Sequence, residues 1–309
     1  MRKRGAPERL NGMLTQDAHV TRPMPRRVFL ELLAVAGVAP HASGQTGAAA
    51  PTPRRVFITG STDGLGLAAA RRLIDQGHAV VLHARTKERA ASLDGLAKRA
   101  LGVVIGDLGS AAETRALSES VNRIGRMDAV IHNAGTVGRT GRGTTPEGHS
   151  TTLAVNALAP YLLTALMARP ARLIYLSSSM HRGADASLSD IDWTARPWDA
   201  NTAYSESKLY VTALAFAIAR RWRTVLSNAV DPGWVPTKMG GPEAPDPLAL
   251  GHATQEWLAV SDDSAAKVSG HYWHHLRRTE PAKAVLDVAF QERLLARFAE
   301  MTGVALAPE

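Results

Sequence analysis

The chain has 309 residues, of which 45% are hydrophobic and 21% are charged, proportions typical of a globular protein with a sizeable core. It contains no cysteine, which excludes disulfides, thiolate catalysis and cysteine-bound zinc. The net charge is +8, but no basic stripe carries interleaved aromatic residues, so the charge does not indicate a nucleic-acid-binding protein.

Residues 1–53 form an N-terminal extension that differs in composition from the rest. It holds seven basic and three acidic residues, so half of the net charge lies here. Arg26 and Arg27 precede a short apolar run, Leu32–Ala39, and then small residues, a pattern that resembles a bacterial twin-arginine export signal. The run is shorter than the ~20 apolar residues that cross a bilayer. The alternative is a disordered tail, lengthened by a start codon assigned too early, on a cytoplasmic protein.

From residue 54 to residue 309 we expect one domain in which strands and helices alternate. That alternation requires a parallel sheet with helices on both faces, and right-handed crossovers then give a doubly wound Rossmann-type α/β fold. The predicted strands are Arg55–Thr59, Ala79–His83, Gly102–Ile105, Ala129–His132, Arg172–Leu176 and Val225–Val230. The predicted helices are Leu65–Gln76, Lys87–Ala100, Ala111–Ile124, Thr151–Ala168, Ala203–Trp222 and Val285–Met301.

A glycine-rich turn joins the first predicted strand to the first helix. Glycines allow its unusual backbone angles and let a pyrophosphate approach the main chain, while the helix N-terminus offers N–H groups and a positive dipole end. The turn therefore predicts a dinucleotide site. The predicted ligands are Gly60, Ser61, Thr62, Asp63, Gly64, Leu65 and Gly66.

Three further motifs follow in chain order: Asn133-Ala134-Gly135, Ser177-Ser178-Ser179, and Tyr204-Ser205-Glu206-Ser207-Lys208. With the Gly-x-x-x-Gly-x-Gly turn, they resemble the short-chain dehydrogenase/reductase (SDR) family over about residues 54–303. The long gap between Ser178 and Tyr204, and the tail Gly270–Gly303, are similar to the retinol-dehydrogenase-like branch. The resemblance implies an oxidoreductase that interconverts a carbonyl and an alcohol. It also implies a small-molecule substrate and a homodimer or homotetramer.

Tyr204 and Lys208 are four residues apart on a predicted helix and therefore lie on one face. Hydride transfer to a carbonyl needs a proton donor, and the reverse reaction needs a base. A tyrosine with a pKa near ~10 is a poor base at neutral pH, and a nearby cation lowers that pKa. The spacing places an ammonium group beside the phenol.

The resemblance assigns roles to these residues. It implies that Tyr204 is the general acid/base and that Lys208 binds the nicotinamide ribose and lowers the tyrosine pKa. It implies that Ser178 hydrogen-bonds the substrate carbonyl, although the flanking Ser177 and Ser179 leave the register of this serine open. Asn156 matches the position that supports a water relay to the lysine.

The end of the second predicted strand indicates the cofactor. A carboxylate there would bind the ribose of NAD and repel the extra phosphate of NADP, but this chain has Arg85, which can form a charge-assisted fork to a phosphate. We therefore expect NADP(H) rather than NAD(H). The alternative is an ordinary surface arginine at a strand end.

Other cofactor contacts follow from the resemblance. Asp107 matches the position that meets the adenine amino group, with Leu108 beside it. Asn133 matches the position that stabilises the sheet and lines the cofactor site, with Ala134 and Gly135. The turn after the sixth predicted strand is expected to contact the nicotinamide amide through Pro232, Gly233, Val235 and Thr237. The Pro- and Gly-rich segment that continues to Leu250 is expected to be a mobile substrate lid.

Three alternatives were weighed. His271, His274 and His275 lack the glutamate of an HExxH zinc site, so we expect packing or surface histidines and no metal. A catalytically silent NADP-binding regulator or sensor on the same fold would be expected to lose the serine, tyrosine or lysine, and all three are present. An epimerase or dehydratase of the extended relatives would carry a different glycine spacing and a larger C-terminal substrate domain.

The export interpretation predicts that the protein isolated from its host has lost its N-terminal signal by cleavage. N-terminal sequencing measures this directly. An uncut chain in the cytosol would favour the disordered tail instead.

Overall fold

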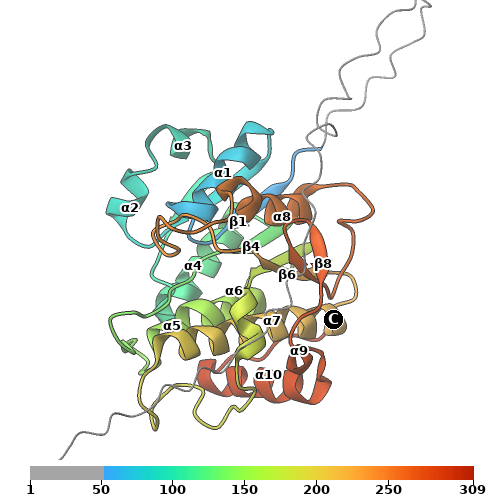
Figure 1. Ribbon diagram of the computed structural model, residues 1–309. Coiled ribbons are helices and arrows are strands. Elements are labelled where there is room, and N and C mark those ends of the chain that lie inside the picture. Colours follow the sequence, from blue (N-terminus) through green and yellow to red (C-terminus); the bar gives the residue numbers. More distant parts are fainter. Residues whose placement is uncertain (1–51) are drawn as a thin grey trace, which may run out of the picture. The chain divides into compact units, whose positions relative to one another are not determined.

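The computed structural model describes residues 52–309, so the predicted export signal lies outside the described residues. The described residues form one eight-stranded sheet in the order β3-β2-β1-β4-β5-β6-β7-β8 (Figure 1). Neighbouring strands are parallel except for β7 and β8. This confirms the predicted doubly wound Rossmann-type fold. The strands are β1 (Arg55–Ile58), β2 (Ala79–Ala84), β3 (Gly102–Ile105), β4 (Ala129–His132), β5 (Arg172–Leu176), β6 (Leu226–Asp231), β7 (Tyr272–His274) and β8 (Arg277–Thr279).

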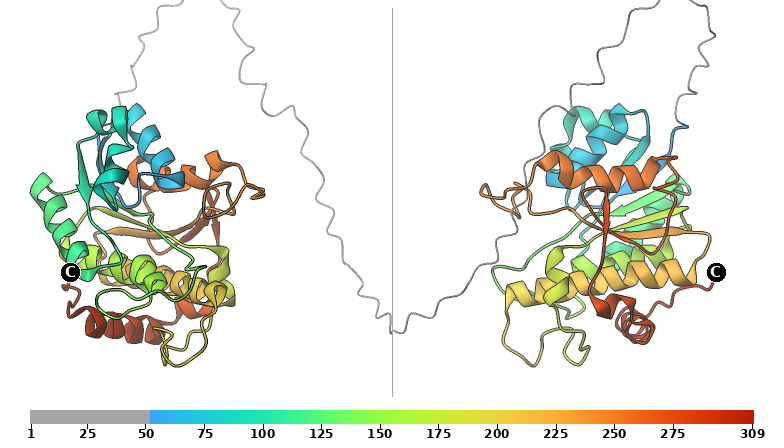
Figure 2. Two further views of the ribbon diagram at one scale, coloured as in Figure 1. Left: turned by 90° about the vertical axis from the view of Figure 1, so that its left-hand side faces the viewer. Right: turned by 45° about the vertical axis from the view of Figure 1, so that its right-hand side comes forward.

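The helices cover both faces of the sheet, as Figure 2 shows. Within residues 52–309, none of them is both long and apolar enough to cross a membrane. The α-helices are α1 (Gly64–Asp75), α2 (Lys87–Ala91), α3 (Asp94–Arg99), α4 (Ala111–Ile124), α5 (Thr151–Leu153), α6 (Ala159–Leu166), α7 (Ala200–Arg221), α8 (Leu248–Val260), α9 (Lys283–Leu286) and α10 (Val288–Thr302). A π-helical turn, η2 (Ala154–Leu158), joins α5 to α6, and a 3₁₀ helix, η3 (Ser179–Gly183), follows β5.

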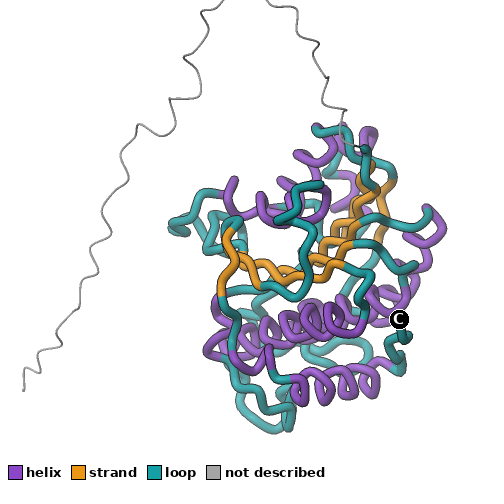
Figure 3. The backbone as a smooth tube through the Cα atoms, turned by 90° about the vertical axis from the view of Figure 1, so that its right-hand side faces the viewer, coloured by secondary structure: helices purple, strands orange, loops and turns teal. Residues whose placement is uncertain are grey.

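Two apolar cores lie on opposite faces of the sheet, because side chains along each strand alternate between the faces. Phe57 and Tyr175 belong to the core that includes α4, α6, α7 and α10. Val56 and Ile131 belong to the core that includes α1 and α8. Figure 3 shows the strands as one twisted layer between these two helical layers. Burial on both faces explains why the strands appear in the sequence as short apolar runs.

The structure corrects several predicted elements. The predicted helix Lys87–Ala100 is two helices, α2 and α3, because the backbone at Asp94 has a φ of 39° and interrupts the ladder. The predicted helix Thr151–Ala168 contains the π-helical turn and ends at Leu166. The tail helix is likewise divided into α9 and α10 at Asp287.

Four elements were not predicted. The 3₁₀ helix η3 follows β5, helix α8 follows the Pro- and Gly-rich segment, and strands β7 and β8 extend the sheet beyond β6. The strands are three residues each, too short to show alternation, and β7 forms only because β6 offers it a parallel partner.

Candidate active site

A groove of about 600 Å³ lies at the carboxyl ends of the parallel strands. It includes the point where the strand order turns from β1 to β4, the topological switch point at which α/β sheets bind ligands. Fifteen of the predicted site residues line it. They are Gly60, Thr62, Asp63, Gly64, Leu65, Arg85, Asp107, Leu108, Asn133, Ala134, Gly135, Tyr204, Lys208, Pro232 and Thr237.

The predicted phosphate-binding turn is held in place by close backbone contacts. Gly60 has a φ of 65°, and a Cβ there would lie 3.0 Å from Ala134 Cα. A Cβ at Gly66 would lie 2.3 Å from the Asn133 side chain, so only glycine fits. The Asn133 amide donates to the Thr59 carbonyl at 2.9 Å, which fastens the end of β4 to the turn. This brings the two cofactor motifs together.

His83 supports this turn, and sequence reasoning missed it. The Gly60 N–H donates to His83 Nδ1 at 2.8 Å, so in the neutral ring Nε2 carries the hydrogen and donates to the Gly106 carbonyl, also at 2.8 Å. Burial lowers the pKa of His83, which favours the neutral ring. The imidazole therefore joins the phosphate-binding turn to the end of β3. Its signal in the sequence is a polar residue inside an otherwise apolar strand.

Two arginines line the end of the groove where the sequence predicts the adenosine half of the cofactor. Arg85 is exposed immediately after β2, and Arg89 lies four residues later in α2; both line the groove. Arg89 also pairs with Asp63 at 3.4 Å. Arg89 was not predicted, although its spacing of four from Arg85 is a usable signal. On the other side of this end, the Asp107 carboxylate accepts from the Gly109 N–H at 2.8 Å.

Tyr204 and Lys208 lie on one face of α7, as their spacing predicts. The Lys208 ammonium is 5.5 Å from the centre of the Tyr204 ring and donates to the Leu176 carbonyl at 2.8 Å. Burial raises the pKa of Tyr204 to about 12 and lowers the pKa of Lys208 to about 8. Both shifts have one physical cause, because a low-dielectric site disfavours the charged form of each group.

The three serines after β5 have different surroundings. Ser177 is buried, and its hydroxyl bonds to that of Thr212 at 2.6 Å. Ser178 is half-buried, and its side-chain contact with Tyr204 lowers the tyrosine pKa, against the larger effect of burial. Ser179 is exposed and begins η3. Ser178 is therefore the serine whose hydroxyl meets the tyrosine.

Asn156 lies in the π-helical turn and is buried. Its side chain accepts from the Thr136 N–H at 2.8 Å and donates to the Thr136 carbonyl and to the Ser207 hydroxyl, both at 2.9 Å. It thus ties the loop after β4 to the face of α7 that carries Tyr204 and Lys208. Wider π turns are frequently found at functional sites.

Six of the predicted site residues do not line the groove itself. They are Asn156, Ser61, Gly66, Ser178, Gly233 and Val235.

A buried carboxylate, Asp231, ends β6 beside this pair, and sequence reasoning did not assign it a role. Its side chain is almost fully buried and accepts from the Gly233 N–H at 3.0 Å. The Asp231 charge raises the pKa of Lys208, opposing the effect of burial. His274 on β7 approaches it, with Nδ1 3.6 Å from the carboxylate. A buried ammonium is therefore offset by a carboxylate from the neighbouring strand.

Two of the three C-terminal histidines lie together: the rings of His274 and His275 are stacked with their centres 3.9 Å apart, and His275 contacts the Pro232 carbonyl at 3.1 Å. His271 lies apart from them and packs edge to face against Trp273. In residues 52–309, no three metal-ligating side chains form a group that could hold a metal ion.

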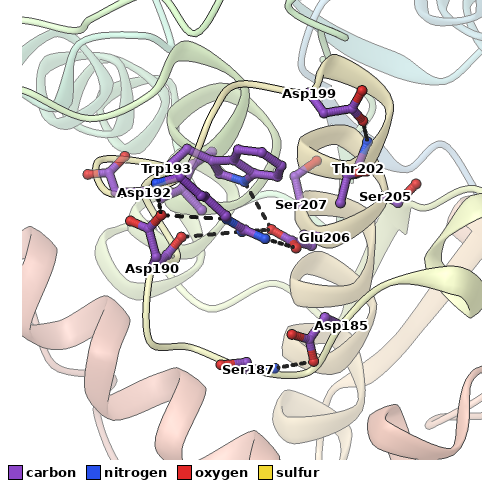
Figure 4. Close-up of polar contacts among 12 residues, drawn as sticks. Asp185, Ser187, Asp190, Asp192, Trp193, Asp199, Thr202, Ser205, Glu206 and Ser207 are labelled. Carbon is purple, nitrogen blue, oxygen red and sulfur yellow. Dashed lines mark hydrogen bonds and ion pairs between the residues drawn. The ribbon is translucent and has the colours of Figure 1, made fainter.

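The long segment between Ser178 and Tyr204 is fastened to α7 by Glu206, which points away from the groove-facing pair. Glu206 is buried, accepts from the Trp193 indole at 3.0 Å and is paired with Arg196 at 2.5 Å (Figure 4). Trp193 and Trp198 pack edge to face, and the Trp198 indole donates to the Gly138 carbonyl at 3.2 Å. The segment therefore holds the loop after β4 against the start of the catalytic helix.

The family is settled by comparison with known proteins. The model of the short chain dehydrogenase family matches residues 54–247, which is more than half of the chain. The chain belongs to the short-chain dehydrogenase/reductase family. The predicted SDR resemblance is thereby confirmed.

Individual relatives agree with this assignment. The chain is 40% identical over 255 residues to the short-chain dehydrogenase chry4 of Gibberella zeae, covering 82% of this chain and 98% of that protein. It is 28% identical over 302 residues to human retinol dehydrogenase 13, covering 84% of this chain and 89% of that protein, which supports the retinol-dehydrogenase-like branch. A crystal structure of a short-chain dehydrogenase from Shigella flexneri, complexed with NADP, has the same fold, with a TM-score of 0.58 and 22% identity over 72% of this chain and 97% of that one.

This SDR is therefore an NAD(P)-dependent oxidoreductase that acts on a small molecule. Its groove fits such a cofactor on structural grounds. Glycine positions leave room at the turn, the first-turn amides of α1 have no acceptor within the helix, and two arginines stand at the adenosine end.

The Asp231 carboxylate yields a pH prediction. Because its charge raises the pKa of Lys208, Asp231→Asn lowers that pKa further below the ordinary lysine value. Activity that requires the lysine cation is lost as the pH rises through its pKa, so the alkaline limb of the pH profile of kcat/KM moves to lower pH. Asparagine keeps the acceptor for Gly233 N–H. The matched control is Asp262→Asn at an exposed site, and an unmoved alkaline limb in Asp231→Asn would contradict the prediction.

Proposed function

We propose that this SDR interconverts a carbonyl and an alcohol using NADP(H), with Tyr204 as general acid/base. The observation that carries the proposal is the placement of Tyr204 and Lys208. They lie on one face of α7, at the end of β5, in the same groove as the phosphate-binding turn. A tyrosine and a lysine that merely stabilised the helix would not need to be buried there.

In the direction of reduction, a nicotinamide held in the groove would supply a hydride to the carbonyl carbon. The C=O π electrons move to oxygen, and that oxygen takes the proton from the Tyr204 hydroxyl. Ser178 donates a hydrogen bond to the same oxygen, where negative charge develops. The alcohol forms, and the tyrosine is left as a phenolate.

Lys208 stabilises this phenolate. The pKa of Tyr204 is raised by burial to about 12, so the phenolate is costly without a cation nearby. The Lys208 ammonium, 5.5 Å from the ring centre, supplies that charge and would also bind the nicotinamide ribose of a bound cofactor. Asn156 fixes the helix face on which both residues stand, through its bonds to Thr136 and Ser207. In the oxidative direction the same phenolate accepts the alcohol proton.

The preference for NADP(H) is supported by Arg85 and Arg89. Both guanidinium groups line the adenosine end of the groove, and planar guanidinium forks suit a phosphate. The related Shigella flexneri structure was solved with NADP. Asp63 pairs with Arg89 at 3.4 Å, which leaves Arg85 as the less engaged of the two cations.

The mechanism predicts that Tyr204→Phe lowers kcat by ~10²–10⁴-fold, because the proton donor is lost while the ring remains. NADPH oxidation over a panel of ketones and aldehydes measures this. Dinucleotide binding, followed by fluorescence, should be retained within a few-fold and serves as the folding control. Full activity of the variant would contradict the mechanism. Tight binding by the wild type with no turnover on any carbonyl would favour the silent regulator.

The cofactor assignment predicts a change of preference. Arg85→Ala combined with Arg89→Ala should raise the KM for NADPH by roughly tenfold or more, since two charge-assisted phosphate contacts are removed. The KM for NADH should change little. Arg99→Ala, which also removes an arginine engaged in an exposed ion pair, is the matched control. A wild-type enzyme that uses NADH better than NADPH would overturn the assignment.

A further inference from the structure

The segment between β6 and α8, residues 232–247, lines the groove through Pro232, Thr237, Lys238 and Met239, and we call it the lid segment. It contacts both walls. Lys238 Nζ lies 2.5 Å from the Asp63 carboxylate in the phosphate-binding turn, and Arg139, in the loop after β4, donates to the Met239 carbonyl at 2.9 Å. The lid segment is thus fastened to the turn by a single side-chain ion pair.

The contact falls where the pyrophosphate would lie. Asp63 is the N-cap of α1, and the next residue, Gly64, opens the helix whose first-turn amides are the anion site. A Cβ on Gly64 would be 3.4 Å from the Thr237 side chain. Two adjacent lid residues, Thr237 and Lys238, therefore meet two adjacent residues of the turn.

The charges at this point are unusual for an anion site. The Asp63 carboxylate alone would repel a phosphate, and it is offset by two cations, Lys238 and Arg89. Lys238 holds the pKa of Asp63 below its ordinary value, so the carboxylate stays charged. The Lys238 side chain is 77% exposed, and ion pairs so exposed contribute little stability. An ammonium group also has three N–H donors, more than one carboxylate oxygen uses.

We propose that Lys238 is a phosphate ligand carried by the lid segment, which the pyrophosphate of the dinucleotide captures from Asp63. The pyrophosphate bears more negative charge than one carboxylate and lies at the positive end of α1, so it competes favourably for the ammonium group. Asp63 keeps the lysine poised at the turn until the cofactor arrives. Once the cofactor is bound, Lys238 holds the lid segment to the pyrophosphate instead of to the Asp63 carboxylate. The proposal rests on the proposed function only in requiring a bound dinucleotide.

The test is the equilibrium affinity and dissociation rate of NADP⁺ and NAD⁺, followed by fluorescence and independent of turnover. Lys238→Met should weaken both dinucleotides by the same factor, roughly five- to tenfold, and speed dissociation correspondingly. Asp63→Asn should tighten the binding of both dinucleotides, because it removes the carboxylate that competes for Lys238 and repels the phosphates, while the backbone N–H groups of the turn are kept. Asparagine is also a good N-cap, so α1 is preserved.

The exposed pair Lys267–Asp262, 3.2 Å apart, provides matched controls. Lys267→Met and Asp262→Asn remove the same groups at a distance from the groove and should leave both affinities unchanged. Melting temperatures of all four variants check folding.

Three results would overturn the proposal. An affinity of Lys238→Met within twofold of the wild type would show that the lysine is no ligand. A loss confined to NADP⁺ would place it on the 2′-phosphate. An equal loss of dinucleotide affinity in Asp63→Asn and Lys238→Met would show that the ion pair only holds the lid segment on the turn and that Lys238 does not bind the phosphate. A wild type that binds neither dinucleotide would instead overturn the proposed function, before any variant is compared.

Discussion

The buried ammonium group of Lys208 is the constraint on which the site depends. A charge out of water is costly unless neighbouring groups stabilise it, and here the Leu176 carbonyl and the Asp231 carboxylate do so from the ends of two adjacent strands. The register that places Leu176 beside Val230 fixes where those groups stand. Helix α7 can therefore pack on β5 and β6 in only one position along its axis. The same packing places Tyr204, one helical turn before Lys208.

Much of the fold could be predicted because its signals are local. Buried parallel strands must be short apolar runs, so β1 to β6 were located to within a residue or two at their ends. The phosphate-binding turn could be identified because its glycines are required by close local contacts that leave no room for a Cβ atom, as at Gly66 beside Asn133. Helical periodicity places Tyr204 and Lys208 on one face of a helix, but this spacing is common, and the pair is singled out only by its order after the glycine-rich turn, the Asn133 motif and the serine run. The roles of these residues come from the family resemblance.

The rest depends on contacts between residues far apart in the chain. The neutral imidazole of His83 serves the turn only because β2 brings it beside Gly60, 23 residues earlier. Lys238 and Asp63 are separated by 175 residues, and no pattern near either residue indicates the other. Asp231 raises the pKa of Lys208 only because α7 packs against the end of β6, a contact that no local sequence pattern indicates. The break at Asp94 reflects a left-handed residue that helix propensity does not reveal.

Two segments near the candidate site are held in place differently. The segment ending at Trp198 is held by a buried carboxylate, Glu206, that pairs with Arg196 and the Trp193 indole, so removing Arg196 would leave a charge unpaired in the interior. The lid segment is held to the phosphate-binding turn through exposed groups. The first segment is therefore stiff and the lid segment compliant. For protein engineering, this asymmetry means that the groove is best reshaped by redesigning the lid segment, while the segment fastened by Glu206 is left unchanged so that α7 keeps its position.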